Sequence, residues 1–154
     1  MKIILIDDDE DFCKSVDRWV KRMNQAKDAD PENPIQLHVT SKTDDFLGLV
    51  NEHANASGKT LALIDMDIWG DKEAGLNLLE TIKLRSPKNV SITPSVIYSN
   101  SSDPKEILQS YSYGANSFYW KGEGTKQKSR FSELVRHWRD FVSNPHEHSL
   151  VALK

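Results

Sequence analysis

The sequence lacks three features that would each indicate a different class of protein. It contains one cysteine, Cys13, so no internal disulfide can form, and we expect this thiol to pack within a helix. It has no apolar stretch approaching a membrane span and no signal-peptide pattern, so we expect a cytoplasmic protein that does not contact membrane. It has no excess of positive charge, since its net charge is -3 and its pI is near 5.9. Direct binding to nucleic acid is therefore not expected.

A length of 154 residues suits one well-packed domain and is short for two. We expect a domain over residues 1–142 and a C-terminal tail over residues 143–154. The tail contains His146 and His148, for which we favour a solvated segment over a metal site.

Short apolar runs alternate with segments of helical periodicity five times along the chain. The expected strands cover residues 3–6, 35–39, 61–65, 95–99 and 117–121. Between and after them, the apolar residues expected to face inward from helices are Phe12, Val16, Trp19 or Val20, and Met23; Phe46, Leu47, Leu49 and Val50; Leu76, Leu79 and Ile82; Ile107, Leu108 and Tyr111; and Phe131, Leu134, Val135, Trp138 and Phe141 or Val142. This alternation predicts an α/β fold, a doubly wound parallel sheet of five strands with helices on both faces.

Breaks between these segments come from glycine and proline. Ser57-Gly58 is expected to end the second helix, Pro87 the third, and Gly114 the fourth, while Asp103-Pro104 is expected to begin the fourth. These positions leave short connections between most of the elements.

Acidic residues follow two of the apolar runs. Asp7-Asp8-Asp9 comes after the first strand, and Asp65 ends the third. In an open parallel sheet, ligands bind beyond the carboxyl ends of the strands, so these acids are expected to converge. Two carboxylates about 4 Å apart repel by roughly 4 kcal/mol at an effective dielectric near 20. A compensating cation is expected, and Mg²⁺, which carboxylates bind together with phosphate oxygens, is the natural candidate.

Two further polar residues end the remaining strands of the predicted sheet, Ser99 the fourth and Lys121 the fifth. With the acids, this order resembles the receiver domain of bacterial two-component response regulators (CheY-like) over roughly residues 2–142. The resemblance implies a flavodoxin-like sheet with strand order 2-1-3-4-5. The residues that carry the resemblance are Asp7, Asp8, Asp65, Ser99 and Lys121.

The resemblance implies that Asp65 is a phosphoacceptor, which takes a phosphoryl group from a histidine kinase or a histidine phosphotransfer protein and forms an acyl phosphate. Lys121 and the hydroxyl of Ser99 would contact the phosphoryl oxygens. The protein would be a signalling phosphoacceptor, not an enzyme acting on other molecules, and would catalyse its own Mg²⁺-dependent phosphorylation and dephosphorylation. The implied metal ligands are Asp7, Asp8, Asp65 and the backbone carbonyl of Asp67.

In the family, an aromatic residue in strand five changes rotamer when phosphate draws the strand-four hydroxyl toward itself. Here these positions are Phe118 and Ser99. The resemblance implies that this switch reshapes a face that contacts a downstream target protein, and it allows a homodimer through the same face. The alternative that Phe118 is an ordinary strand aromatic stays open.

The chain departs from the receiver pattern at several positions. Gly122 stands where receivers commonly carry a proline, so we expect the orientation of the Lys121 side chain to be less firmly fixed. Ser99 replaces the usual threonine and keeps the hydroxyl. The loop after Asp65 is about two residues longer than usual and contains Trp69. Asp67 adds negative charge, from which we expect slower phosphorylation by small donors than with a neutral residue.

Two other functions stay open at this point. Asp65-Met66-Asp67 also matches the Asp-x-Asp signature of haloacid-dehalogenase-type phosphatases, although that family places further acids after its lysine. A degenerate receiver that serves as a phosphorylation-independent protein-binding module is the second alternative, because of Gly122 and the altered loop.

Overall fold

The computed structural model describes residues 1–55 and 59–143. Its elements are β1 (Lys2–Ile6), α1 (Glu10–Gln25), β2 (Gln36–Thr40), α2 (Thr43–Asn55), β3 (Thr60–Ile64), α3 (Ala74–Leu84), α4 (Lys88–Ser91), β4 (Ser95–Ser99), α5 (Pro104–Ser112), β5 (Ser117–Trp120) and α6 (Lys126–Ser143). The predicted alternation is confirmed, with the addition of the single turn α4 after Pro87. The expected break at Ser57-Gly58 and the histidines of the tail lie outside the described residues.

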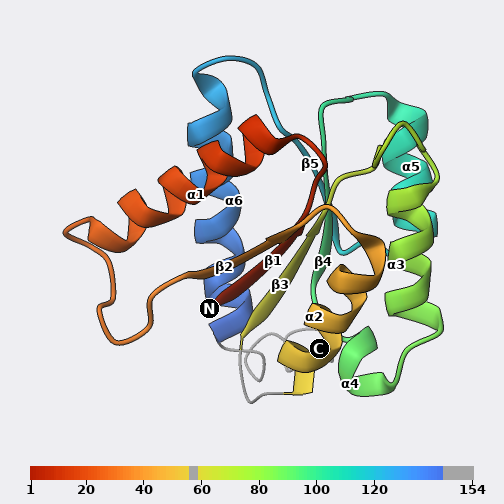
Figure 1. Cartoon of the computed structure of the whole chain (residues 1–154), viewed down its shortest axis with the longest axis horizontal. Helices are drawn as coiled ribbons and strands as arrows, with labels where there is room; N and C mark the ends of the chain where they lie inside the picture. Colours follow the sequence, from red (N-terminus) through yellow and green to blue (C-terminus); the bar gives the residue numbers. More distant parts are fainter. Residues whose placement is uncertain (56–58, 144–154) are drawn as a thin grey trace, which may run out of the picture.

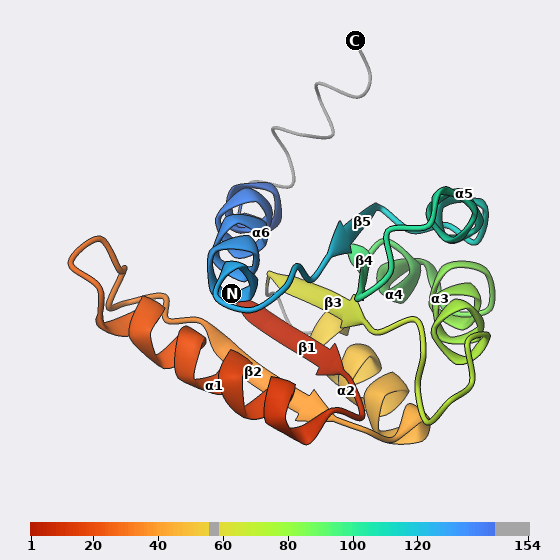
Figure 2. The same cartoon turned by 90° about the horizontal axis from the view of Figure 1, so that it is seen from above.

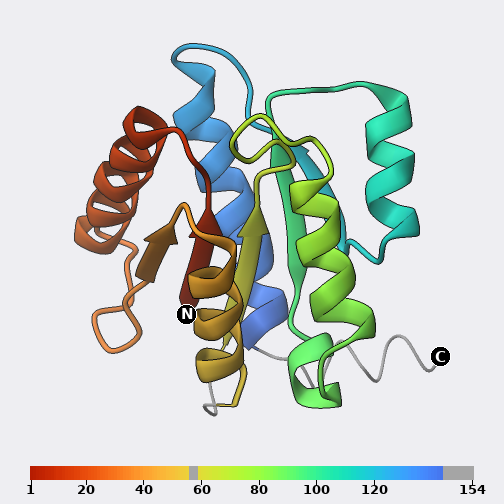
Figure 3. The ribbon, with the colours of Figure 1, turned by 45° about the vertical axis from the view of Figure 1, so that its right-hand side comes forward.

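The five strands form one parallel sheet in the order β2-β1-β3-β4-β5, which confirms the predicted topology (Figure 1). Helices α1 and α6 cover one face, and α2, α3, α4 and α5 lie on the other (Figure 2). Because all strands point the same way, their carboxyl ends meet at one end of the molecule (Figure 3).

The continuous apolar runs are explained by burial on both faces of the sheet. Alternate residues of β1 point to opposite sides, so Ile3 and Leu5 pack with α1 and α6, whereas Ile4 and Ile6 pack with α2 and α3. The larger members of the α1 and α6 core are Phe12, Tyr98, Phe131, Leu134, Val135 and Trp138. Two apolar layers therefore hold the central strands, and with them the loops at the strand ends.

Two expectations for helix α5, which lies at an edge of the sheet, are wrong. In α5, Leu108 is 71% exposed and Tyr111 is 48% exposed. The fully buried residue of that helix is Ser110, whose hydroxyl donates to the carbonyl oxygen of Glu106. Helix α5 packs beside the edge strand β5, so its outer apolar residues have no layer above them.

Gly75 lets α3 approach the end of β3 closely. A Cβ atom at this position would lie 2.4 Å from the carbonyl oxygen of Asp65 and 2.7 Å from Cα of Met66. The Gly75 amide donates to the carbonyl oxygen of Met66. The first turn of α3 thereby supports the backbone that carries Asp65, and a larger residue would push this support away.

Among the described residues, no helix has both the length and the apolar character that crossing a bilayer requires.

Candidate functional site

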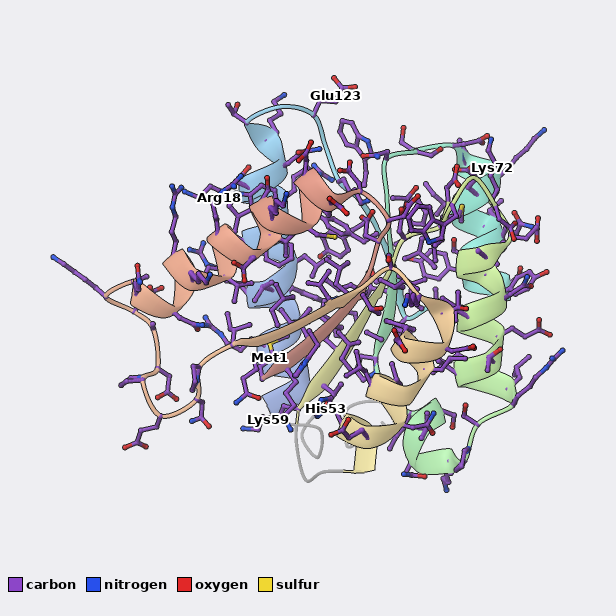
Figure 4. The ribbon with its side chains drawn as sticks, viewed as in Figure 1. Met1, Arg18, His53, Lys59, Lys72 and Glu123 are labelled. Carbon is purple, nitrogen blue, oxygen red and sulfur yellow. The ribbon has the colours of Figure 1, made fainter. Side chains whose placement is uncertain are left out.

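A cavity of about 450 Å³ opens at the carboxyl ends of β1, β3, β4 and β5. Figure 4 shows Lys72 and Glu123, from the loops after β3 and β5, at this end of the molecule, and Met1 and Lys59 at the opposite end. Six of the residues singled out from the sequence line the cavity: Asp7, Asp8, Asp65, Asp67, Ser99 and Lys121. Phe118 does not line it; this side chain is half-buried against the core beneath α2 and α3.

The acids after β1 have different local roles. Asp9 is the N-cap of α1, because its carboxylate accepts from the amide of Phe12 at 3.0 Å. Asp7 is buried, and its Oδ1 accepts from the amide of Asp9 at 2.9 Å. Asp8 is half-buried, and its Oδ2 accepts from the amide of Trp69 at 3.0 Å. The cap orients the loop so that Asp7 and Asp8 lie in the cavity.

Asp7, Asp8 and Asp65 each offer a carboxylate oxygen, and these atoms lie within 4.8 Å of one another. Burial raises the pKa of Asp65 to about 7, the Lys121 ammonium opposes this rise, and the charges of Asp7 and Asp8 add to it. The donor set consists of hard oxygen ligands, which fits a divalent cation such as Mg²⁺. The described residues therefore form a compact site in which negative charge exceeds positive charge.

Lys121 is 2% exposed and provides the positive charge within this cluster. Its Nζ lies 2.5 Å from Oδ2 of Asp7 and 3.5 Å from Oδ1 of Asp65. The ammonium also lies 4.3 Å from the centroid of the Phe12 ring, within cation–π range. The buried ion pair and the ring hold the Lys121 side chain although no proline follows it.

Ser99 closes the site from β4. The residue is 5% exposed, and its hydroxyl oxygen accepts from the amide of Ser101 at 3.1 Å. Its carbonyl oxygen accepts from the amide of Lys121 at 2.7 Å, which ties the ends of β4 and β5 together. Because the Ser101 contact uses the oxygen as an acceptor, the hydroxyl proton can still be donated to a ligand.

The loop after Asp65 forms one wall of the cavity. Asp67 is exposed there, and Gly70 and Lys72 also line the wall. Trp69 has a positive φ of 55°, and its indole Nε1 donates to the carbonyl oxygen of Ser41 at 2.8 Å. The lengthened loop is thereby anchored to the segment after β2.

Sequence patterns did not identify Lys72 and Glu106 as lining residues. Lys72 lies in a loop without periodicity, and Glu106 lies in the first turn of α5, where an acid is expected simply to favour the helix N-terminus. The one available signal was their position shortly after strands that end in Asp65 and Ser99. Their approach to the cavity depends on how α3 and α5 pack.

Cys13 lies next to the site in space but has no reactive character. Burial raises the pKa of its thiol to about 12, and the charge of Asp7 adds to this rise. The thiol therefore stays protonated near neutral pH, which agrees with the packing role expected from the sequence.

No protein-family model and no curated protein sequence matches the chain. Among solved structures, the phosphorylated cyanobacterial phytochrome response regulator RcpA is 22% identical, with a TM-score of 0.67, 89% of this chain covered and 92% of that one. The Mn²⁺-bound response regulator Rcp1 is 18% identical, with a TM-score of 0.66, 89% of this chain covered and 93% of that one. A response regulator receiver domain from Rhodospirillum rubrum is 19% identical, with a TM-score of 0.67 and coverages of 93% and 94%. This chain therefore has the fold of response regulator receiver domains.

Proposed function

We propose that the protein is a phosphoacceptor in two-component signalling, in which Asp65 takes a phosphoryl group from a histidine kinase or a histidine phosphotransfer protein. One observation carries the proposal: Asp7, Asp8, Asp65, Ser99 and Lys121 meet around one cavity at the carboxyl edge of a receiver fold. A carboxylate oxygen of Asp65 attacks phosphorus, the bond from phosphorus to the donor histidine nitrogen breaks, and that imidazole keeps the electron pair and takes a proton.

A divalent cation, Mg²⁺ in the proposal, would be held by Asp7, Asp8, Asp65 and the backbone carbonyl of Asp67, and would neutralise charge on the phosphoryl oxygens. The close grouping of three carboxylate oxygens supports this ligand set. The similar regulator Rcp1 has been crystallised in a Mn²⁺-bound form, which agrees with a divalent site in this fold.

Lys121 and Ser99 stabilise the charge that develops during transfer. The Lys121 ammonium lies 3.5 Å from Asp65, close enough to pair with an oxygen of a phosphoryl group on that carboxylate. The Ser99 hydroxyl donates to another oxygen. Because phosphoryl transfer depends mainly on positioning and charge stabilisation, these groups suffice for self-phosphorylation and for the later hydrolysis of the acyl phosphate.

The output is a protein contact made by the face of α5, β5 and α6. In the proposal, Ser99 moves toward the phosphoryl group and Phe118 follows it inward. Phe118 lies in β5 opposite Ile97, two residues before Ser99 in β4, and its half-buried side chain packs against the core. The exposed Leu108 and Tyr111 of α5 offer apolar surface to a target protein or to a second copy of this chain.

The cavity also bears on the phosphatase alternative. Its lining residues include none that follows Lys121 in the described chain, so the later acids that the phosphatase family uses have no counterpart there. This distribution favours a phosphoacceptor over a phosphatase.

The test is intact-mass analysis after treatment with acetyl phosphate, with and without Mg²⁺, beside an Asp65→Asn variant. A single phosphoryl adduct that needs Mg²⁺ and is absent from the variant supports the proposal. No adduct, under conditions that label a known receiver, supports the phosphorylation-independent binding module. Donor consumption without an adduct supports the phosphatase.

A further inference from the structure

A side chain from α6 holds the segment around Lys121. Arg130, in the second turn of α6, donates from Nε to the carbonyl oxygen of Trp120 at 2.8 Å. Its guanidinium carbon lies 5.0 Å from the centroid of the Trp120 ring, within cation–π range. Trp120 is the last residue of β5 and directly precedes Lys121. Helix α6 is therefore bound, through Arg130, to the end of β5 immediately before Lys121.

Gly122, on the other side of Lys121, leaves the space that Arg130 occupies. Gly122 has a φ of +82°, and a Cβ atom there would lie 2.6 Å from Cδ of Arg130. The carbonyl oxygen of Gly122 also accepts from Nε2 of Gln127, at 3.4 Å. A larger residue at position 122 would meet both an unfavourable backbone angle and the Arg130 side chain.

Trp120 extends these contacts to the loop that carries Ser99. Its indole Nε1 donates to the carbonyl oxygen of Asn100 at 3.0 Å. The amide of Lys121 donates to the carbonyl oxygen of Ser99 at 2.7 Å. A continuous path of contacts thus runs from Arg130 through Trp120 to the residue that follows Ser99.

We propose that Arg130 is a positioning residue for phosphoryl transfer. By holding Trp120 and packing over Gly122, it fixes the backbone on both sides of Lys121 and so sets the direction from which the ammonium reaches Asp65. The proposal rests on the proposed role of Asp65 as the phosphoacceptor. Arg130 acts through Lys121 and does not line the cavity.

The first test compares Arg130→Ala and Arg130→Lys with Arg136→Ala, an exposed arginine on the same helix. Adduct formation is followed at several acetyl phosphate concentrations with Mg²⁺ present. We expect Arg130→Ala to lower the maximal rate by about tenfold and to change the half-saturating concentration by less than about twofold, because misplaced charge matters most in the transition state. Arg130→Lys keeps the positive charge but lacks the Nε donor, so its maximal rate should lie between those of Arg130→Ala and the unmodified protein.

Arg136→Ala should behave as the unmodified protein. A maximal rate for Arg130→Ala within about twofold of the unmodified rate would overturn the proposal, since even small misplacement of catalytic groups slows transfer more than this. A larger half-saturating concentration with an unchanged maximal rate would also overturn it, because it would show a role in donor binding.

A second readout does not depend on phosphorylation. In ¹⁵N–¹H spectra, Arg130→Ala should shift the Trp120 indole resonance and the amide resonances of Ser101 and Lys121, which follow the two carbonyl groups in these contacts, whereas Arg136→Ala should not. Unchanged Ser101 and Lys121 resonances would overturn the proposal. If the unmodified protein forms no adduct, the proposed function fails, and these spectra still show whether Arg130 positions Lys121.

A steric readout completes the test. Gly122→Ala should lower the urea midpoint of unfolding less in an Arg130→Ala background than alone, because the clash with Arg130 is then gone. An equal loss in both backgrounds would show that Arg130 does not occupy this space, and would contradict the proposal.

Discussion

Two lysines at opposite ends of the sheet, Lys121 buried and Lys83 half-buried, are accommodated in different ways. Lys121, at the carboxyl end, pairs with Asp7 and Asp65. Lys83, on α3 near the amino end of β4, donates to the backbone carbonyl oxygens of Ser91 and Thr93 at 3.0 and 2.7 Å. Burial lowers the pKa of Lys83 to about 8. The backbone carbonyl dipoles therefore only partly offset the cost of burying the Lys83 ammonium. The Lys121 ammonium, in contrast, lies among carboxylates whose negative charge exceeds its own positive charge.

The largest effect is expected from removing Lys121. Lys121→Met leaves Asp7 and Asp65 buried without their cation, so we expect a loss of about 3–5 kcal/mol in the free energy of unfolding when divalent ions are absent. Urea unfolding in EDTA measures this loss, and added Mg²⁺ should recover part of it. An unchanged stability would show that Lys121 is not needed to balance the acids.

A gain in stability is expected from neutralising the acid opposite Lys121. The folded-state pKa of Asp65 is raised from 3.8 to about 7, so its favourable contribution is present below about pH 4 and is lost as the pH rises through 7. Asp65→Asn removes this loss and should raise the free energy of unfolding by about 1–3 kcal/mol at pH 8 in EDTA.

Urea unfolding of both proteins at pH 4 and pH 8 measures this difference. The two stabilities should be close at pH 4 and differ at pH 8. A variant that is less stable at pH 8 would mean that the contact of Asp65 with Lys121 outweighs the cost of burying its charge.

The opposite end of the sheet should respond to pH in the other direction. The pKa of Lys83 is lowered from 10.5 to about 8, so the folded state loses its proton first and stability should rise between pH 8 and 10.5. Because Lys83 is only partly buried, we expect a rise of about 1–2 kcal/mol, which Lys83→Met should abolish. Thermal unfolding across this pH range checks the prediction, and the same slope in both proteins would contradict it.

The smallest effect concerns the exposed wall of the cavity. Asp67 places a further negative charge where an anionic donor must enter. Asp67→Asn should therefore increase the rate of adduct formation from acetyl phosphate by a few fold, roughly 1 kcal/mol in activation free energy. Lys72→Gln, on the same wall, should change the rate in the opposite direction. An unchanged rate for Asp67→Asn would remove the idea that this charge slows phosphorylation.

Much of the site could be predicted because the chain itself places polar residues at strand ends. Asp7, Asp65 and Lys121 each follow an apolar run, and in a parallel sheet these ends share one edge. The roles of Lys72 and Glu106 in lining the cavity could not be predicted, since they depend on how α3 and α5 pack. The outward orientation of Leu108 and Tyr111 was missed for the same reason: helical periodicity shows which residues share a face, not whether another layer covers it.

The alternation of strands and helices, the burial of the central strands on both faces, and the polar residues at the strand ends could all be predicted from the order of the amino acids. These follow from local patterns, since apolar runs and strand ends are read from neighbouring residues. The tertiary structure decided that Lys121 pairs most closely with Asp7 and that Arg130 packs against Gly122. These contacts depend on how side chains from separate elements pack against one another, which the pattern of residues within one segment does not show.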